Sequence, residues 1–271
     1  MDCHVKEYFR SFSDKAPEAQ SGAFHKVIAL HEAPDLVWRE ISKLVPELPK
    51  GWFELVELFA RDRIDLLRDF WLSQLPFCPH IVEKLDPFFD KIDDIGVFLV
   101  QRSFDDPWKA EMVYSVKDNG GFFRGNPPAS DEQLYHLQKQ FDSVILPEDY
   151  MAFLKIHNGF SKATDTGILP VEKMRGSYLT LQEFFEVDDA IFTTDGTPVN
   201  PKSLIPFYES FGMPFYQCFW SEWYPESEMG NVYCSANKGQ ISNVSCSDPN
   251  SDQMAFNTFA DWLFFYLETV S

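Results

Sequence analysis

The spacing of apolar residues changes near residue 95, and this change requires a fold that combines helices with a sheet. In the first ninety residues, apolar side chains recur at the i, i+3, i+4 and i+7 spacing of one helix face, as in Trp52, Leu55, Val56 and Phe59. In residues 95–102 (IGVFLVQR) and 108–116 (WKAEMVYSV) they are mainly β-branched or aromatic, and a short turn sequence separates the two runs. We therefore expect four or five short helices followed by an antiparallel hairpin.

The second half of the chain carries clear helix boundaries. Ser130 and Gln133 have the spacing of a capping box, in which each side chain binds a free backbone N–H of the other residue. Pro147 suits the first position of the next helix, and Asn158-Gly159 supplies a left-handed residue that ends it. Short strands are expected after it, at residues 168–171, 203–208, 214–220, 231–235 and 240–244. We also expect a short helix at residues 179–185, capped by Thr180, and a closing helix with Phe256, Phe259, Leu263 and Leu267 on one face.

This order of elements predicts an α+β fold with an antiparallel or mixed sheet flanked by helices, preceded by an N-terminal helical region. The links between the later strands are too short for parallel crossovers, which favours antiparallel pairing. We place the helical region at residues 1–93 and a second domain at residues 94–271. In this second domain, a hairpin at residues 94–128 leads into a core at residues 129–271.

The charge is strongly negative and lies mainly in the second half of the chain. The 23 Lys and Arg residues against 42 Asp and Glu give a net charge of −19, and residues 129–271 contribute 7 − 20 = −13 of it. A nucleic-acid partner is not expected, because nucleic-acid-binding proteins contact phosphates through Lys and Arg. The five cysteines are scattered without a CxxC pair, and no apolar stretch approaches the ~20 residues that span a bilayer. We expect reduced thiols, a cytoplasmic location, and no membrane, cofactor or metal.

The segment Leu146–Phe160 (LPEDYMAFLKIHNGF) is similar to the signature of the SUKH superfamily, which includes a yeast cell-wall synthesis regulator and bacterial immunity proteins. The capped helix at Ser130 precedes this segment, and ILPV, SLIPFY and a closing helix (FNTFADWLFFYL) follow it in the order typical of the superfamily. The resemblance covers about residues 129–271. Two features depart from the pattern: Phe160 replaces the second glycine of the signature, and the N-terminal helical region has no counterpart. The resemblance implies a non-catalytic domain that binds another protein, in bacterial members often a toxin or nuclease domain.

The segment with the most partner-like chemistry is residues 220–228 (WSEWYPESE), where three large aromatic residues stand among three glutamates. Aromatic side chains surrounded by charge are typical of the residues that dominate binding energy. A second acidic stretch lies near residues 188–195. The residues that we expect to bind a partner with a basic surface are Trp220, Glu222, Trp223, Tyr224, Glu226, Glu228, Asp188 and Asp189. In the alternative interpretation, the tryptophans fold back onto the sheet and the acidic residues are only a solvated face.

Signals of catalysis are weak. His157 continues the apolar stripe of the helix after Pro147, which predicts a structural histidine near the end of that helix. Cys218 lies within an expected strand, and a cysteine nucleophile there needs a histidine brought close by long-range folding. His31-Glu32 lacks the second histidine of a zincin motif, because residue 35 is aspartate. We expect no enzymatic activity; a hydrolase that uses carboxylates or a Cys–His pair is the alternative.

Overall fold

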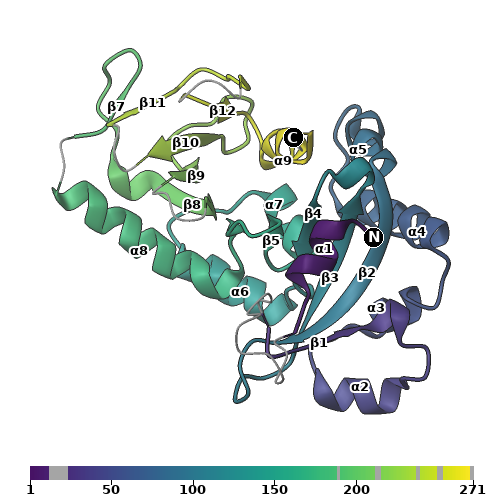
Figure 1. Ribbon diagram of the computed structural model, residues 1–271. Coiled ribbons are helices and arrows are strands. Elements are labelled where there is room, and N and C mark those ends of the chain that lie inside the picture. The colour runs from purple at the N-terminus through teal and green to yellow at the C-terminus, as the bar shows by residue number, and fades with distance from the viewer. Residues whose placement is uncertain (12–23, 188–189, 211–214, 236–238, 249–252, 269–271) are drawn as a thin grey trace. The chain divides into compact units, whose positions relative to one another are not determined.

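The computed structural model describes residues 1–11, 24–187, 190–210, 215–235, 239–248 and 253–268 (Figure 1). The chain divides into two compact units. Unit 1 contains Met1–Pro128 together with Phe160–Ala163, and unit 2 contains Ala129–Gly159 and Thr164–Thr269. Each unit is built around its own set of paired strands, so the two are described separately.

Unit 1 is an antiparallel sheet covered by helices. Its strands pair in the order β1 (Lys26–Ala29), β2 (Ile92–Gln101), β3 (Lys109–Val116), β4 (Phe122–Gly125) and β5 (Phe160–Lys162). The helices are α1 (Cys3–Tyr8), α2 (Trp38–Leu44), α3 (Lys50–Leu55), α4 (Ala60–Gln74) and α5 (Ile81–Asp90), with 3-10 turns η1 (Leu30–Glu32) and η2 (Lys117–Asn119). The predicted hairpin is present as β2 and β3, and the predicted short helices are present as α1–α5.

The two faces of this sheet carry different helices, because successive side chains of a strand point to opposite sides. On one face, Phe9 stacks on Phe98 of β2 with ring centroids 4.2 Å apart, and Val113 of β3 belongs to the same buried cluster. The neighbouring Tyr114 faces the other way, where its hydroxyl accepts a hydrogen bond from Nε1 of Trp71 in α4 at 3.1 Å. Trp71 also contacts Phe88 of α5, so α4 and α5 share the second core.

The described part of unit 2 combines its own antiparallel strands with four helices. Its paired strands are β6 (Gly167–Ile168), β8 (Leu204–Glu209), β9 (Phe215–Trp220), β10 (Asn231–Ser235) and β12 (Ala255–Phe256), and β7 (Phe192–Thr193) pairs in parallel with β11 (Gln240–Ile241). The helices are α6 (Asp131–Gln140), α7 (Glu148–Leu154), α8 (Val171–Val187) and α9 (Phe259–Glu268), and a 3-10 turn, η3 (Pro201–Ser203), precedes β8. Four buried rings join α7, α9 and the sheet: Tyr150, Phe207, Phe219 and Phe259.

The local signals in unit 2 agree with the structure at several positions. Ser130 and Gln133 form both bonds of the capping box, and Gly159 has the expected positive φ of 96° after α7. The α+β class, with helices flanking an antiparallel sheet, is confirmed. Within the described ranges, no helix is both long enough and apolar enough to cross a bilayer.

The extent of α8 is the largest difference from the sequence prediction. We expected a strand at residues 168–171 and a short helix beginning at Thr180, but the strand ends at Ile168 and α8 runs from Val171 to Val187 with Thr180 in its interior. The cause is a distant cap, because the side-chain Oδ1 of Asn158 accepts the Val171 N–H at 2.8 Å. This bond satisfies one of the free N–H groups at the start of a helix.

Two further expectations for the chain were wrong in detail. Phe59 does not continue the helix of Trp52, because α3 ends at Leu55 and Phe59 is the residue that precedes α4. Phe256 lies in strand β12 rather than in the closing helix. Contacts between residues place the β2–β3 hairpin in unit 1 together with the N-terminal helices. The domain boundary predicted between residues 93 and 94 stays a prediction.

Candidate functional site

The predicted binding segment forms most of the loop between β9 and β10, residues 221–230, which we call the β9–β10 loop. Its backbone is closed by three hydrogen bonds: Trp223 N–H to Trp220 O (2.9 Å), Gly230 N–H to Trp223 O (3.0 Å) and Trp220 N–H to Gly230 O (3.0 Å). Ser221 N–H also donates to Ser203 O at 2.9 Å. The loop therefore has a defined backbone conformation rather than an open chain of polar residues.

The expectation that both tryptophans face outward is wrong for Trp220. Trp220 is only 7% exposed and lies in the hydrophobic core of unit 2. Because side chains alternate along a strand, Trp220 shares the inward face of β9 with Cys218. Trp223 is half-buried, packs against the same core and lies 5.9 Å from the Trp220 ring, so it fixes the loop on the sheet. Tyr224, 50% exposed, is the aromatic residue of this group that faces solvent.

The three glutamates of the β9–β10 loop are exposed. The Glu222 carboxylate accepts a hydrogen bond from Asn200 Nδ2 at 3.3 Å, and the Glu226 carboxylate accepts one from Asn257 Nδ2 at 2.7 Å. Both donors are neutral amides. Within the described part of the chain, Glu222, Glu226 and Glu228 form no ion pair with a lysine or arginine. Their negative charge is therefore not neutralised by a cation among the residues that the structure describes.

Asp149 is a partly buried acidic group whose charge interacts with that of Glu228 in this loop. Its Oδ1 accepts the Tyr150 N–H and its Oδ2 accepts the Ala260 N–H, both at 2.8 Å, so it ties α7 to the first turn of α9. Burial, with a smaller contribution from the negative charge of Glu228, raises the pKa of Asp149 to about 6 against the two N–H donors, which lower it. Ala260 lies 111 residues away in sequence, so no local pattern indicates this contact.

Gly230 permits the close packing of Trp223. A Cβ atom at position 230 would lie 2.5 Å from Cζ3 of Trp223 and 3.1 Å from Cδ of Pro225. Gly230→Ala should therefore displace the Trp223 ring, lower the free energy of unfolding by about 1–3 kcal/mol, and make indole fluorescence more accessible to acrylamide. Gly51→Ala is the matched control, because nothing lies within 4 Å of a Cβ atom there. A quenching profile that is the same in both variants would contradict this packing.

The second acidic stretch is separate from the loop. Asp188 and Asp189 lie outside the described residues, so their predicted role stays a prediction. Asp195 is exposed in the turn after β7, where its carboxylate accepts hydrogen bonds from Thr193, Asn243 and Thr197. These bonds hold the pKa of Asp195 well below its usual value, with the Thr193 hydroxyl contributing most. Asp195 therefore has a local role in ordering this turn.

The residues weighed for catalysis have structural surroundings. Cys218 is buried, and burial raises the pKa of its thiol well above the usual value, which opposes formation of the reactive thiolate. His157 is buried three residues after α7 ends, and its backbone N–H donates to Phe153 O.

At the N-terminus, a carboxylate oxygen of Asp2, the Sγ of Cys3 and a ring nitrogen of His4 lie within 4.8 Å of one another. There the Asp2 carboxylate caps α1 by accepting the His4 N–H at 2.6 Å.

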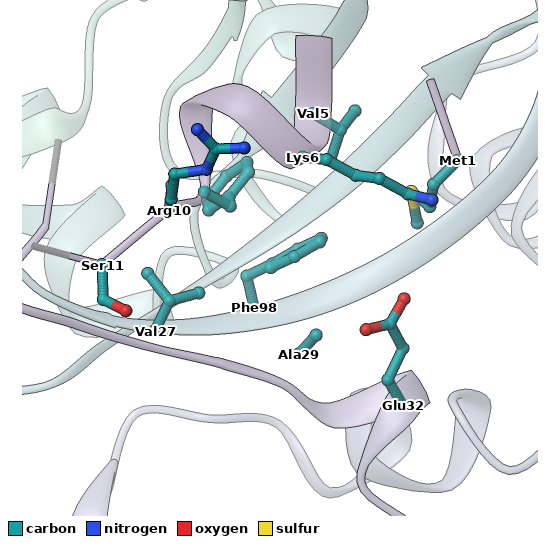
Figure 2. Close-up of a pocket in the computed structure, with 10 residues that line it drawn as sticks. Met1, Val5, Lys6, Arg10, Ser11, Val27, Ala29, Glu32 and Phe98 are labelled. Atoms are coloured by element: carbon teal, nitrogen blue, oxygen red, sulfur yellow. The ribbon is translucent and has the colours of Figure 1, made fainter. Parts of the chain in front are cut away.

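A pocket of about 350 Å³ lies in unit 1 between α1 and strands β1 and β2 (Figure 2). Phe98 lies between α1 and β1, and the side chains of Lys6 and Glu32 come from opposite sides of the opening. The pocket is lined by Met1, Val5, Lys6, Phe9, Arg10, Ser11, Val27, Ala29, Glu32 and Phe98. The lining combines apolar side chains with the charged Lys6, Arg10 and Glu32, and no sequence pattern indicated this pocket.

His31 lies beside the pocket wall, with its ring edge-on to Phe98 at 5.1 Å. Its side chain is buried, and neither ring nitrogen has a hydrogen-bond partner among the described residues. Burial lowers the pKa of His31, so the ring is neutral at pH 7. An uncharged ring on an apolar wall is a packing element here.

Unit 2 thus combines an α+β fold with an acidic loop that is held on its strands. The model of the SMI1 / KNR4 family (SUKH-1) matches residues 128–264, about half of the chain, and the protein belongs to this family. The family comprises immunity-type and regulatory domains that are generally not catalytic. The predicted SUKH membership is thus confirmed. No curated protein matches the chain.

Proposed function

We propose that this protein is a non-catalytic binding module of the cytoplasm that holds a partner protein with a basic surface, of the toxin or nuclease type, on its β9–β10 loop. Family membership supports an immunity-like or regulatory role. In this proposal, unit 2 supplies the recognition loop. The helical N-terminal region adds surface to the same chain.

The observation that carries the proposal is the arrangement of charge on a fixed loop. Trp223 anchors the loop to the core, and the backbone hydrogen bonds described above define its conformation. Glu222, Glu226 and Glu228 are thereby displayed next to the exposed ring of Tyr224 without a neutralising cation among the described residues. A preorganised loop loses little entropy when it binds. Its carboxylates then attract a basic surface and accelerate association.

The test is charge reversal with a matched control. Glu222→Lys, Glu226→Lys and Glu228→Lys together change the net charge from −19 to −13. The control reverses Glu132, Asp142 and Glu183, three exposed acids on the helical side of unit 2, and makes the same change in net charge. We expect both triple reversals to leave the fold intact, because all six acidic side chains are exposed.

We expect the loop variant to lower the association rate with a basic nuclease domain at least tenfold at low salt, as measured by stopped-flow fluorescence. The same variant should reduce the dependence of that rate on ionic strength. The control variant should change the rate only slightly. If both triple variants lower the association rate by the same factor, the attraction depends on total charge alone. The β9–β10 loop is then not the binding surface.

A further inference from the structure

Helix α4 in unit 1 and the residue before it expose large apolar side chains. Phe59, Leu66 and Phe70 are 84%, 51% and 36% exposed. Leu66 and Phe70 are at i and i+4, which places them about 40° apart on one side of a helix of 3.6 residues per turn, and Phe59 is the N-cap residue of the helix. We call these three residues the α4 stripe. Phe77, which follows the helix, is also strongly exposed.

The α4 stripe is more than the edge of the buried helix face. The buried face of α4 consists of Arg63, Leu67 and Trp71, and Arg63 there binds Asp94 of β2 at 2.5 Å. A residue at the margin of such a face is usually half-covered, whereas Phe59 and Leu66 expose more than half of their surface. Large apolar side chains exposed together along one helix are typical of interaction sites in soluble proteins.

The charges beside the stripe have one sign. Asp62 and Asp69 are at i−4 and i+3 from Leu66, which places both on the same side of that residue, away from the buried face of the helix. Both are exposed, and neither forms an ion pair in the ranges that the structure describes. The nearby arginines of α4 are engaged elsewhere: Arg61 with Asp65, and Arg68 with Asp86. A ligand of the stripe therefore meets apolar surface bordered by free carboxylates.

This charge pattern disfavours two possible ligands of the α4 stripe, a second copy of the chain and an anionic membrane. In a symmetric dimer, two α4 helices would place Leu66 of each copy against Phe70 of the other. The twofold axis then lies near residue 68. This arrangement brings Asp69 of one copy close to Asp69 of the other. Each copy also carries a net charge of −19. An anionic membrane surface attracts Lys and Arg and repels the carboxylates that border this stripe.

We propose that the α4 stripe is a docking surface for an amphipathic helix of another protein, with leucine-like side chains on its contact face and Lys or Arg along one flank. The apolar face of that helix covers Phe59, Leu66 and Phe70, and its cationic flank pairs with Asp62 and Asp69. Helix-on-helix docking of this type uses anchors at i, i+3, i+4 and i+7. The site is outside residues 128–264, so it is a second surface, independent of the β9–β10 loop.

The test uses two synthetic 18-residue helical peptides with the same leucine face, one with a lysine flank and one with a glutamate flank. Binding to the full chain is measured by fluorescence anisotropy at physiological salt. We expect the lysine peptide to bind more tightly than the glutamate peptide. L66S/F70S should weaken its binding at least tenfold, and D62K/D69K should reverse the preference between the peptides.

Controls separate this surface from other effects. Phe104→Ser removes an equally exposed ring of unit 1, 74% exposed in the β2–β3 turn, and should leave peptide binding unchanged. The Glu222, Glu226 and Glu228 triple reversal should also leave it unchanged, which distinguishes a failure here from a failure of the proposed function. If the L66S/F70S variant unfolds, the peptide preference of the D62K/D69K variant alone tests the proposal, because that variant alters only exposed side chains.

Three outcomes would overturn the proposal. The first is equal binding of both peptides, or binding that the stripe variants do not alter. The second is a dimer of the natural chain in sedimentation velocity that L66S/F70S converts to a monomer, since the occupant is then a second copy. The third is flotation of the chain with phosphatidylcholine or phosphatidylserine vesicles that the same variant abolishes.

Discussion

Trp71→Ala should cost unit 1 about 3–5 kcal/mol of unfolding free energy, the range for truncation of a large buried aromatic side chain. Trp71 is fully buried and contacts the rings of Phe88, Phe89, Tyr114 and Phe160. The variant leaves a cavity where α4 and α5 meet the sheet. It also removes the 3.1 Å hydrogen bond from the indole to the Tyr114 hydroxyl.

Two variants make this result interpretable. Trp71→Phe keeps an aromatic ring and loses the N–H donor, so it should cost distinctly less than Trp71→Ala. Phe59→Ala, at the residue that precedes the same helix and is 84% exposed, should change stability by no more than about 0.5 kcal/mol. Urea unfolding followed by circular dichroism measures the three values, and hydrogen exchange of the β3 amides assigns the loss to unit 1. A loss below about 1 kcal/mol for Trp71→Ala would contradict the packing described for this core.

The elements that could be predicted from sequence are those whose signals are local. The capping box of Ser130 and Gln133, the left-handed Gly159 and the β2–β3 hairpin each depend on residues close together in the chain. For these, backbone preferences and short-range hydrogen bonds already determine the conformation. The change of apolar spacing near residue 95 was a reliable guide for the same reason, because it reports local structure on both sides.

The elements that could not be predicted depend on distant partners. The N-terminus of α8 is capped by Asn158, so the helix begins nine residues before Thr180, where the local signal placed it. Strand β1 was not predicted, since its four residues are ordered by antiparallel pairing with β2, about seventy residues later. In both cases the decisive hydrogen-bond partner is remote in sequence.

The candidate site shows the same limit at the level of single side chains. The alternation of aromatic and acidic residues identified the β9–β10 loop, and the exposure of its glutamates agrees with that interpretation. Composition cannot show which ring is an anchor and which faces the solvent. That distinction depends on the register of β9, which buries Trp220. With Trp220 in the core, Trp223 packed against it and the glutamates in solvent, the side chains lie as the alternative interpretation expected, and the binding role of the segment stays a prediction.

Asp149 should make the protein more stable at mildly acidic pH than at neutral pH. Burial raises the pKa of Asp149 in the folded state to about 6, whereas an unfolded aspartate titrates near 3.9. Between these values the folded state binds a proton that the unfolded state does not. The contribution of Asp149 to the free energy of unfolding therefore increases as pH falls from about 7 to 4. This contribution is lost as pH rises through 6.

Asp149→Asn tests this linkage because it removes the titration and keeps the size of the side chain. As pH falls from 7 to 4, the free energy of unfolding of the natural chain should increase by up to about 3 kcal/mol relative to that of the variant. Each unit of pKa shift corresponds to about 1.4 kcal/mol. Glu228→Gln should move the midpoint of that gain to lower pH, because Glu228 raises the pKa of Asp149 by charge repulsion. Urea titrations at a series of pH values measure both effects. A stability difference that stays flat from pH 4 to 7 would show that the N–H groups of Tyr150 and Ala260 outweigh burial and keep Asp149 ionised.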